Sequence, residues 1–130
     1  MATRRKYRYP DRATSEAKLT EVEEEKRITY QALRHFYLGN VAAEFERGEY
    51  RVKVLGADSH GGPYVLFSWH CSGQSPTVHA DEAYAWAGRM RRWYGPQAGD
   101  DEECRQLVEL SDEVQRFLNT LWASTMLQSA

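Results

Sequence analysis

The sequence predicts an α+β fold, because the spacing of its apolar residues changes between helical and alternating along the chain. Residues 14–37 carry apolar side chains near helical spacing, an alternating pattern begins at Tyr50, and helical spacing returns from Ala83. The predicted elements are a long N-terminal helix, a two- or three-stranded antiparallel sheet (about 50–56 and 63–71, with 76–79 as an optional third strand) and two C-terminal helices (about 80–94 and 101–127).

Length and composition indicate one globular domain. Of the 130 residues, 42% are hydrophobic and 28% are charged, which supplies one core and a solvated surface. We expect residues 1–13 to form a basic, flexible tail and residues 14–130 to form a single α+β domain. No apolar run approaches the about 18 residues that span a bilayer, and the first residues lack the apolar core of a secretion signal, so a cytoplasmic location is expected.

The first helix is predicted from a segment that lacks Pro and Gly and is rich in Glu, Lys and Ala. Its early turns are mostly charged, so we expect them to project into solvent or to meet a partner, and we expect residues 36–38 to reach the core. Gly39-Asn40 is a helix stop signal. The next apolar residues, Val41, Ala42 and Phe45, are interpreted as a kinked continuation or a short second helix that ends at Gly48.

The sheet is predicted from two alternating segments joined by the loop GADSHGGP, whose glycines and proline suit a hairpin connection. In the first strand Val52 and Val54 alternate with Arg51 and Lys53. The second strand divides into a core face and a solvated face. The core face holds Val65, Phe67, Trp69 and Cys71, and the solvated face holds Tyr64, Leu66, Ser68 and His70.

The two C-terminal helices are predicted from separate apolar stripes. The first stripe consists of Ala83, Trp86, Ala87 and Met90, and its helix ends near Gly95-Pro96. Asp100, with Glu103 three residues later, has the spacing of a capping box for the second helix. The stripe of that helix includes Leu107, Val114, Phe117, Leu118 and Trp122.

Neither metal binding nor catalysis is expected. His60, His70, Cys71 and His79, with Cys104, are zinc-ligand types, but they lack the paired spacing of structural zinc sites, and neighbouring strand residues point to opposite faces. Free thiols are expected, although a Cys71–Cys104 bridge stays open. We find no nucleotide-binding, metalloprotease or nucleophile-elbow motif and assign no catalytic residue or cofactor. A thiol enzyme that uses Cys71 is a third hypothesis.

The solvated face of the hairpin is the main candidate site for a macromolecular ligand. Arg51, Lys53, Tyr64 and His70 combine cationic and aromatic side chains, as phosphate-rich and base-stacking ligands require. Arg89 and Arg92, with the N-terminal tail, extend this candidate surface. The plainer interpretation is a solvated sheet face, since the net charge is −2.

A local resemblance supports the strand order. The stretch EYRVKV, then YVLFSWHC, then TVHADEAYAWAGRM resembles the strand-strand-strand-helix unit of the arm-type DNA-binding domains of phage integrases, with Glu82, Ala83 and Trp86 at the matching positions. The resemblance covers residues 50–94 and implies a three-stranded sheet in the major groove, with Arg51 and Lys53 among the contacts. The acidic first helix departs from the family's pattern.

A protein-binding function is the preferred hypothesis. Glu23 and Glu24 on the first helix, and Trp122 and Met126 on the last, form a candidate partner or dimer surface. Homodimerisation through the last helix stays open. We expect a small, non-enzymatic accessory protein that binds a partner protein or nucleoprotein complex, similar in type to phage-encoded inhibitors of host defence such as anti-CRISPRs. The alternative is nucleic-acid binding through the basic sheet face and the N-terminal tail.

Overall fold

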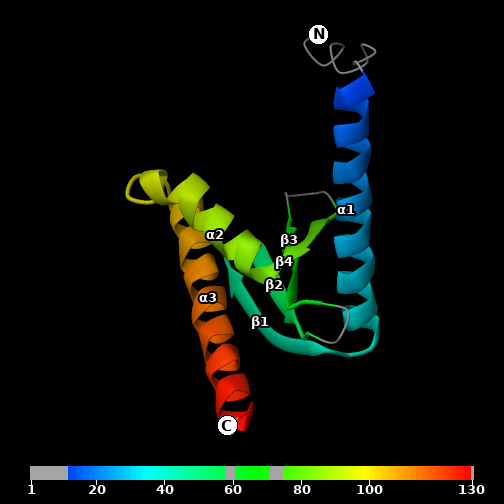
Figure 1. Ribbon diagram of the computed structural model, residues 1–130. Coiled ribbons are helices and arrows are strands. Elements are labelled where there is room, and N and C mark those ends of the chain that lie inside the picture. Colours follow the sequence, from blue (N-terminus) through cyan, green and yellow to red (C-terminus); the bar gives the residue numbers. More distant parts are fainter. Residues whose placement is uncertain (1–11, 58–60, 71–74, 130) are drawn as a thin grey trace.

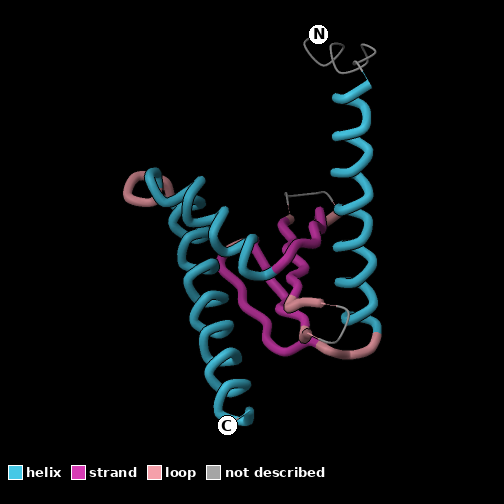
Figure 2. The backbone as a smooth tube through the Cα atoms, viewed as in Figure 1, coloured by secondary structure: helices cyan, strands magenta, loops and turns pink. Residues whose placement is uncertain are grey.

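The protein has three layers, in which a four-stranded antiparallel sheet lies between helix α1 and the helices α2 and α3 (Figures 1 and 2). The computed structural model describes residues 12–57, 61–70 and 75–129, with side chains for 20–57, 61–70 and 75–121. The predicted α+β class is confirmed, with one strand more than expected. The predicted tail, residues 1–13, falls outside the described residues, except for Arg12 and Ala13, which begin helix α1.

Helix α1 spans Arg12–Tyr37, close to the predicted range. Its C-terminal half packs on the sheet through Ile28, Ala32 and Phe36. The predicted stop is confirmed, since Gly39 adopts a φ of 77° and its N–H donates a hydrogen bond of 3.0 Å to the carbonyl oxygen of Phe36. The expectation that residues 36–38 all reach the core is wrong, because Tyr37 is 79% exposed and Leu38 is also exposed.

The segment after α1 is a strand, not the predicted second helix. Strand β1 (Val41–Arg47) pairs antiparallel with β2 (Tyr50–Leu55) across a two-residue turn in which Gly48 adopts a φ of 56°. Its alanines and glutamates favour a helix by propensity. Tertiary packing overrides that preference, because Phe45 packs on Phe117 of α3 with ring centroids 6.2 Å apart.

The predicted hairpin and its optional third strand are confirmed. Strand β2 pairs antiparallel with β3 (Tyr64–Trp69), and β3 pairs antiparallel with β4 (Thr77–Glu82), which gives the order β1-β2-β3-β4. Strand β4 extends to Glu82, so the following helix starts three residues later than predicted.

Helix α2 spans Ala83–Tyr94 and is followed by the short 3₁₀ helix η2 (Gly95–Gln97) and by α3 (Glu102–Ser129). The predicted apolar stripe of α2 is buried as expected. The cap of α3 is Asp101 instead of Asp100, since Asp101 Oδ1 accepts a hydrogen bond of 3.0 Å from the N–H of Cys104. Asp100 instead belongs to the preceding turn, where its N–H donates to the carbonyl oxygen of Gln97.

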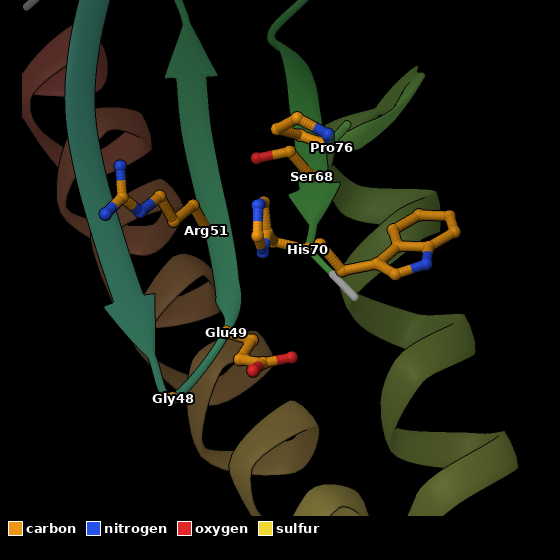
Figure 3. Close-up of a pocket in the computed structure, with 7 residues that line it drawn as sticks. Gly48, Glu49, Arg51, Ser68, His70 and Pro76 are labelled. Carbon is orange, nitrogen blue, oxygen red and sulfur yellow. The ribbon is translucent and has the colours of Figure 1, made fainter. Parts of the chain in front are cut away.

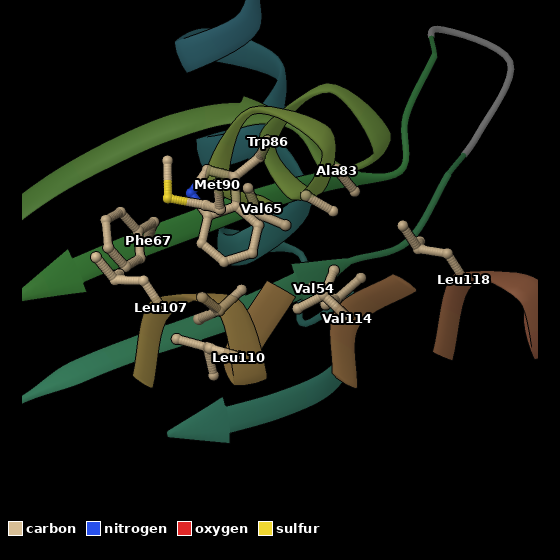
Figure 4. Close-up of a cluster of buried hydrophobic side chains, with 12 residues drawn as sticks. Val54, Val65, Phe67, Ala83, Trp86, Met90, Leu107, Leu110, Val114 and Leu118 are labelled. Atoms are coloured by element: carbon tan, nitrogen blue, oxygen red, sulfur yellow. The ribbon is translucent and has the colours of Figure 1, made fainter. Parts of the chain in front are cut away.

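Two apolar clusters hold the three layers together. The larger one joins β2 and β3 to α2 and α3, and Figure 4 shows side chains from all four elements converging on it. The smaller one lies under α1 and contains Ala32, Leu55, Tyr64 and Leu66. Strand β3 is therefore buried on both faces, which its alternation alone did not indicate. None of the described helices is both long and apolar enough to cross a membrane.

Candidate functional site

The expected basic face of the sheet is half covered by helix α1. Tyr64 is only 1% exposed and packs against the ring of His35, with centroids 5.8 Å apart, so it is a core residue and not a ligand contact. Lys53 is half-buried, with its Nζ atom 5.0 Å from the ring centroid of Phe36. Only Arg51 and His70 of the predicted four remain exposed.

A pocket of about 410 Å³ lies beside these two residues (Figure 3). In Figure 3, Arg51 extends toward β1, where its Nε atom lies 3.3 Å from Glu46 Oε2. Glu49 also lines the pocket. The pocket therefore combines both signs of charge and lacks the uncompensated cations that a phosphate site requires.

The predicted extension of the basic face through Arg89 and Arg92 is wrong, because the sheet separates α2 from Arg51. Arg89 instead forms an ion pair with the buried carboxylate of Asp81 on β4. Asp81 Oδ2 also lies 3.7 Å from His79 Nε2, and Asp81 Oδ1 accepts a hydrogen bond of 2.8 Å from the N–H of Glu82. Arg92 is exposed on the outside of α2.

Ion pairs neutralise much of the positive charge on the described surface. Among the described residues, arginines within 4.0 Å of a carboxylate include Arg27, Arg47, Arg51, Arg89, Arg91 and Arg105. A nucleic-acid site needs clustered cations that are free to meet phosphates. The described residues therefore offer less electrostatic attraction to nucleic acid than the sequence suggests.

Strand β4 is an edge strand of the sheet, with β3 as its one neighbour among the described strands. The N–H of Ala83 donates a hydrogen bond to the carbonyl oxygen of Pro63. Along an antiparallel strand, successive residues point their backbone N–H and C=O groups alternately toward and away from the neighbouring strand. This bond therefore identifies which residues of β4 point these groups toward β3. By that alternation the backbone N–H and C=O groups of Val78 and Ala80 point away from β3. Val78 is 59% exposed, so this edge presents apolar surface together with backbone groups that have no partner strand among the described residues.

An aromatic-walled pocket of about 290 Å³ opens between this part of the sheet and helix α2. Its lining comes from three elements: β3 gives Phe67 and Trp69, β4 gives His79 and Asp81, and the α2 region gives Trp86, Arg89, Met90, Trp93 and Tyr94. Trp93 is an exposed large apolar residue. Sequence patterns gave no sign of this pocket, because its residues come together only when α2 folds back over β4.

The chemistry of the aromatic-walled pocket suits a side chain that is apolar along its length and polar at its end. Trp86 is buried, and its Nε1–H has no hydrogen-bond acceptor among the described residues. Asp81 and Arg89 place a charged pair in the same lining. Apolar walls with a few fixed polar groups are typical of binding pockets.

Histidines and cysteines do not converge in the described part of the chain. His70 and His79 lie on opposite faces of the sheet, since His79 pairs with Phe67. His60 and Cys71 lie outside the described residues. Within the described ranges, no group of three or more His, Cys, Asp or Glu side chains could hold a metal ion. Cys104 is a free, buried thiol, so the Cys71–Cys104 bridge is not formed. Burial, together with the nearby carboxylate of Asp101, raises the pKa of Cys104.

The predicted partner surface is not one surface. Glu23 and Glu24 are exposed on α1, and the hydrogen bond from Arg27 lowers the pKa of Glu24. The side chains of Trp122 and Met126 lie outside the described residues, and the end of α3 that carries them is remote from the start of α1 (Figure 1).

The strand-strand-strand-helix unit suggested by the resemblance to integrase arm-type domains is present as β2, β3, β4 and α2. Helix α1, however, occupies the sheet face that carries Arg51 and Lys53, and would obstruct insertion of that face into a groove. No family model, no curated protein and no solved structure matches the chain.

Proposed function

We propose that the protein is a non-enzymatic accessory protein that acts by binding a partner protein, and that it binds an extended segment of this partner along strand β4. The observation that carries the proposal is the open β4 edge beside the aromatic-walled pocket. Addition of a strand to a sheet edge combines main-chain hydrogen bonds, which give affinity, with pockets for alternate side chains, which give specificity.

The β4 edge and the aromatic-walled pocket would make different contacts with the partner segment. The outward backbone groups of Val78 and Ala80 supply the hydrogen bonds for an incoming strand. A side chain of that strand that points toward α2 enters the pocket, where Trp93 and Trp69 provide apolar contact and the indole N–H of Trp86 can donate to a polar end.

The variant Val78→Pro tests the role of the edge. Proline removes the outward N–H of Val78 but leaves the β3–β4 hydrogen bonds intact, because Val78 makes none of them, and proline is tolerated at such edge positions. Peptides selected on the wild-type protein from a random library should bind Val78→Pro about tenfold more weakly, the effect of losing one well-placed hydrogen bond. Trp93→Ala should weaken the same peptides by at least as much.

Glu44→Pro is the matched control, because it places proline at an outward position of the opposite edge strand, β1. It should leave affinity for the peptides unchanged. Equal binding by wild type and Val78→Pro, with both proteins folded by circular dichroism, would exclude strand addition at β4.

Inhibition of a host nucleoprotein complex, as in anti-CRISPR proteins, would be one use of such a binding edge. The nucleic-acid alternative would use Arg51 and His70, which are exposed next to Trp69, and Arg51 would have to exchange its ion pair with Glu46 for a phosphate. It predicts binding to random duplex DNA with a steep dependence on salt, which is lost in Arg51→Ala/Lys53→Ala. Absence of binding at low salt would remove this alternative.

A further inference from the structure

Helix α1 has two apolar faces, and only one of them packs on the sheet. The packed face contains Ile28, Ala32 and Phe36. Successive residues of the second face are four, four, three and four positions apart in the sequence. This spacing places them on one stripe of an α-helix. We call it the outer stripe, and its members are Val22, Lys26, Tyr30, Leu33 and Tyr37, all exposed.

The first part of α1 also projects beyond the body of the protein. Every residue from 20 to 27 is exposed, and Figure 1 shows the N-terminal half of the helix extending past the sheet. Isolated helical segments of this length are marginal in water, and helices in proteins gain most of their stability from packing of an apolar face. A partner along the outer stripe would supply that packing.

We infer that the outer stripe pairs with the outer stripe of a second copy of this chain, with the two α1 helices antiparallel. The stripe is nearly symmetric about Tyr30. In an antiparallel pair, Tyr30 meets its own copy, Lys26 meets the partner's Leu33, and Val22 meets the partner's Tyr37. The aliphatic stem of Lys26 can pack on leucine while its ammonium group stays in water.

Charge and shape favour a second copy over another occupant. Glu23 and Arg34 lie on the same flank of the outer stripe, on opposite sides of Tyr30 in sequence, so the antiparallel arrangement brings each near the partner's opposite charge. The same arrangement sets the body of each copy beside the projecting half of the other helix. There the exposed Leu38 and Val41 extend the apolar contact.

The first test is solution mass by sedimentation equilibrium. The wild-type chain of 15.1 kDa should sediment as a dimer of about twice that mass at micromolar concentration. Leu33→Glu should be monomeric, because it places a charge in the stripe at a residue that belongs to neither buried cluster. Trp93→Glu, a change at an exposed apolar residue of α2, should remain dimeric. A monomeric wild-type protein would overturn the inference.

Cysteine cross-linking tests the orientation. In a Cys71→Ser background, a mixture of Val22→Cys and Tyr37→Cys chains should form mixed disulfide dimers on mild oxidation, and neither chain alone should form them efficiently. Efficient self-linking of Val22→Cys would contradict the antiparallel arrangement. Dimerisation is independent of the proposed peptide binding, because no residue of the outer stripe lines the aromatic-walled pocket. Leu33→Glu should therefore bind the selected peptides as wild type does, whereas Trp93→Ala should bind them more weakly and stay dimeric.

Discussion

The ion pair between Arg89 and Asp81 should stabilise the fold, and Arg89→Met tests this role directly. The Asp81 side chain is 9% exposed, so loss of the guanidinium leaves a carboxylate where water reaches it poorly. Removing one partner of a buried ion pair costs about 3–5 kcal/mol. Because Arg89 is itself 31% exposed and Asp81 keeps the hydrogen bond from Glu82, we expect the lower end, about 3 kcal/mol.

The assay is urea denaturation of four proteins, namely wild type, Arg89→Met, Asp81→Asn and the double variant. Asparagine keeps an acceptor for the N–H of Glu82 but carries no charge, so the double variant should be less destabilised than the sum of the single variants by about 2 kcal/mol. The exposed Arg92→Met is the control and should change stability by less than about 0.5 kcal/mol. A loss below about 1 kcal/mol in Arg89→Met, or full additivity, would refute the buried pair.

The remaining predictions concern the cap of α3, strand β1 and the buried thiol. Asp101→Ala should lower the free energy of unfolding by about 1 kcal/mol, whereas Asp100→Ala should have little effect; the reverse order in urea denaturation would contradict the assigned cap. Phe45→Ala should cost about 2 kcal/mol, because the ring is half-buried against α3, and a neutral result would argue against β1 as a packed strand. In a Cys71→Ser background, Cys104 should react slowly with iodoacetamide at neutral pH, because its raised pKa leaves little thiolate. The reaction rate should keep rising as the pH passes the ordinary thiol pKa of 9.0. A rate that levels off near neutral pH would contradict the raised pKa.

Local patterns were sufficient to predict the elements whose packing agrees with their periodicity. The stripe of α2 from Ala83 to Met90 is buried as its spacing indicates, and the loop before Tyr64 joins two paired strands. The segment that became β1 carried a weaker signal. Phe45 alternates with Glu44 and Glu46 ahead of Gly48, which is a strand pattern that helix propensity obscured.

Contacts between distant segments were beyond the reach of sequence patterns. Whether Tyr64 faces water or core depends on where α1 packs, and alternation in β3 says only that Tyr64 and Val65 point to opposite sides. Arg89 was predicted to bind a ligand. Its actual partner, the carboxylate of Asp81, belongs to another element, so the spacing of residues along α2 gave no sign of this ion pair. The outer stripe of α1 was visible in the spacing of its residues, but only the structure shows that this face is the exposed one.

Amide hydrogen exchange in the presence of a selected peptide measures strand addition most directly. With the peptide bound, the N–H groups of Val78 and Ala80 should exchange far more slowly, because they become donors to the added strand, while those of Glu44 and Glu46 on β1 should exchange as before. If the peptide protects other amides and leaves Val78 and Ala80 as fast as in the free protein, the partner does not bind along β4.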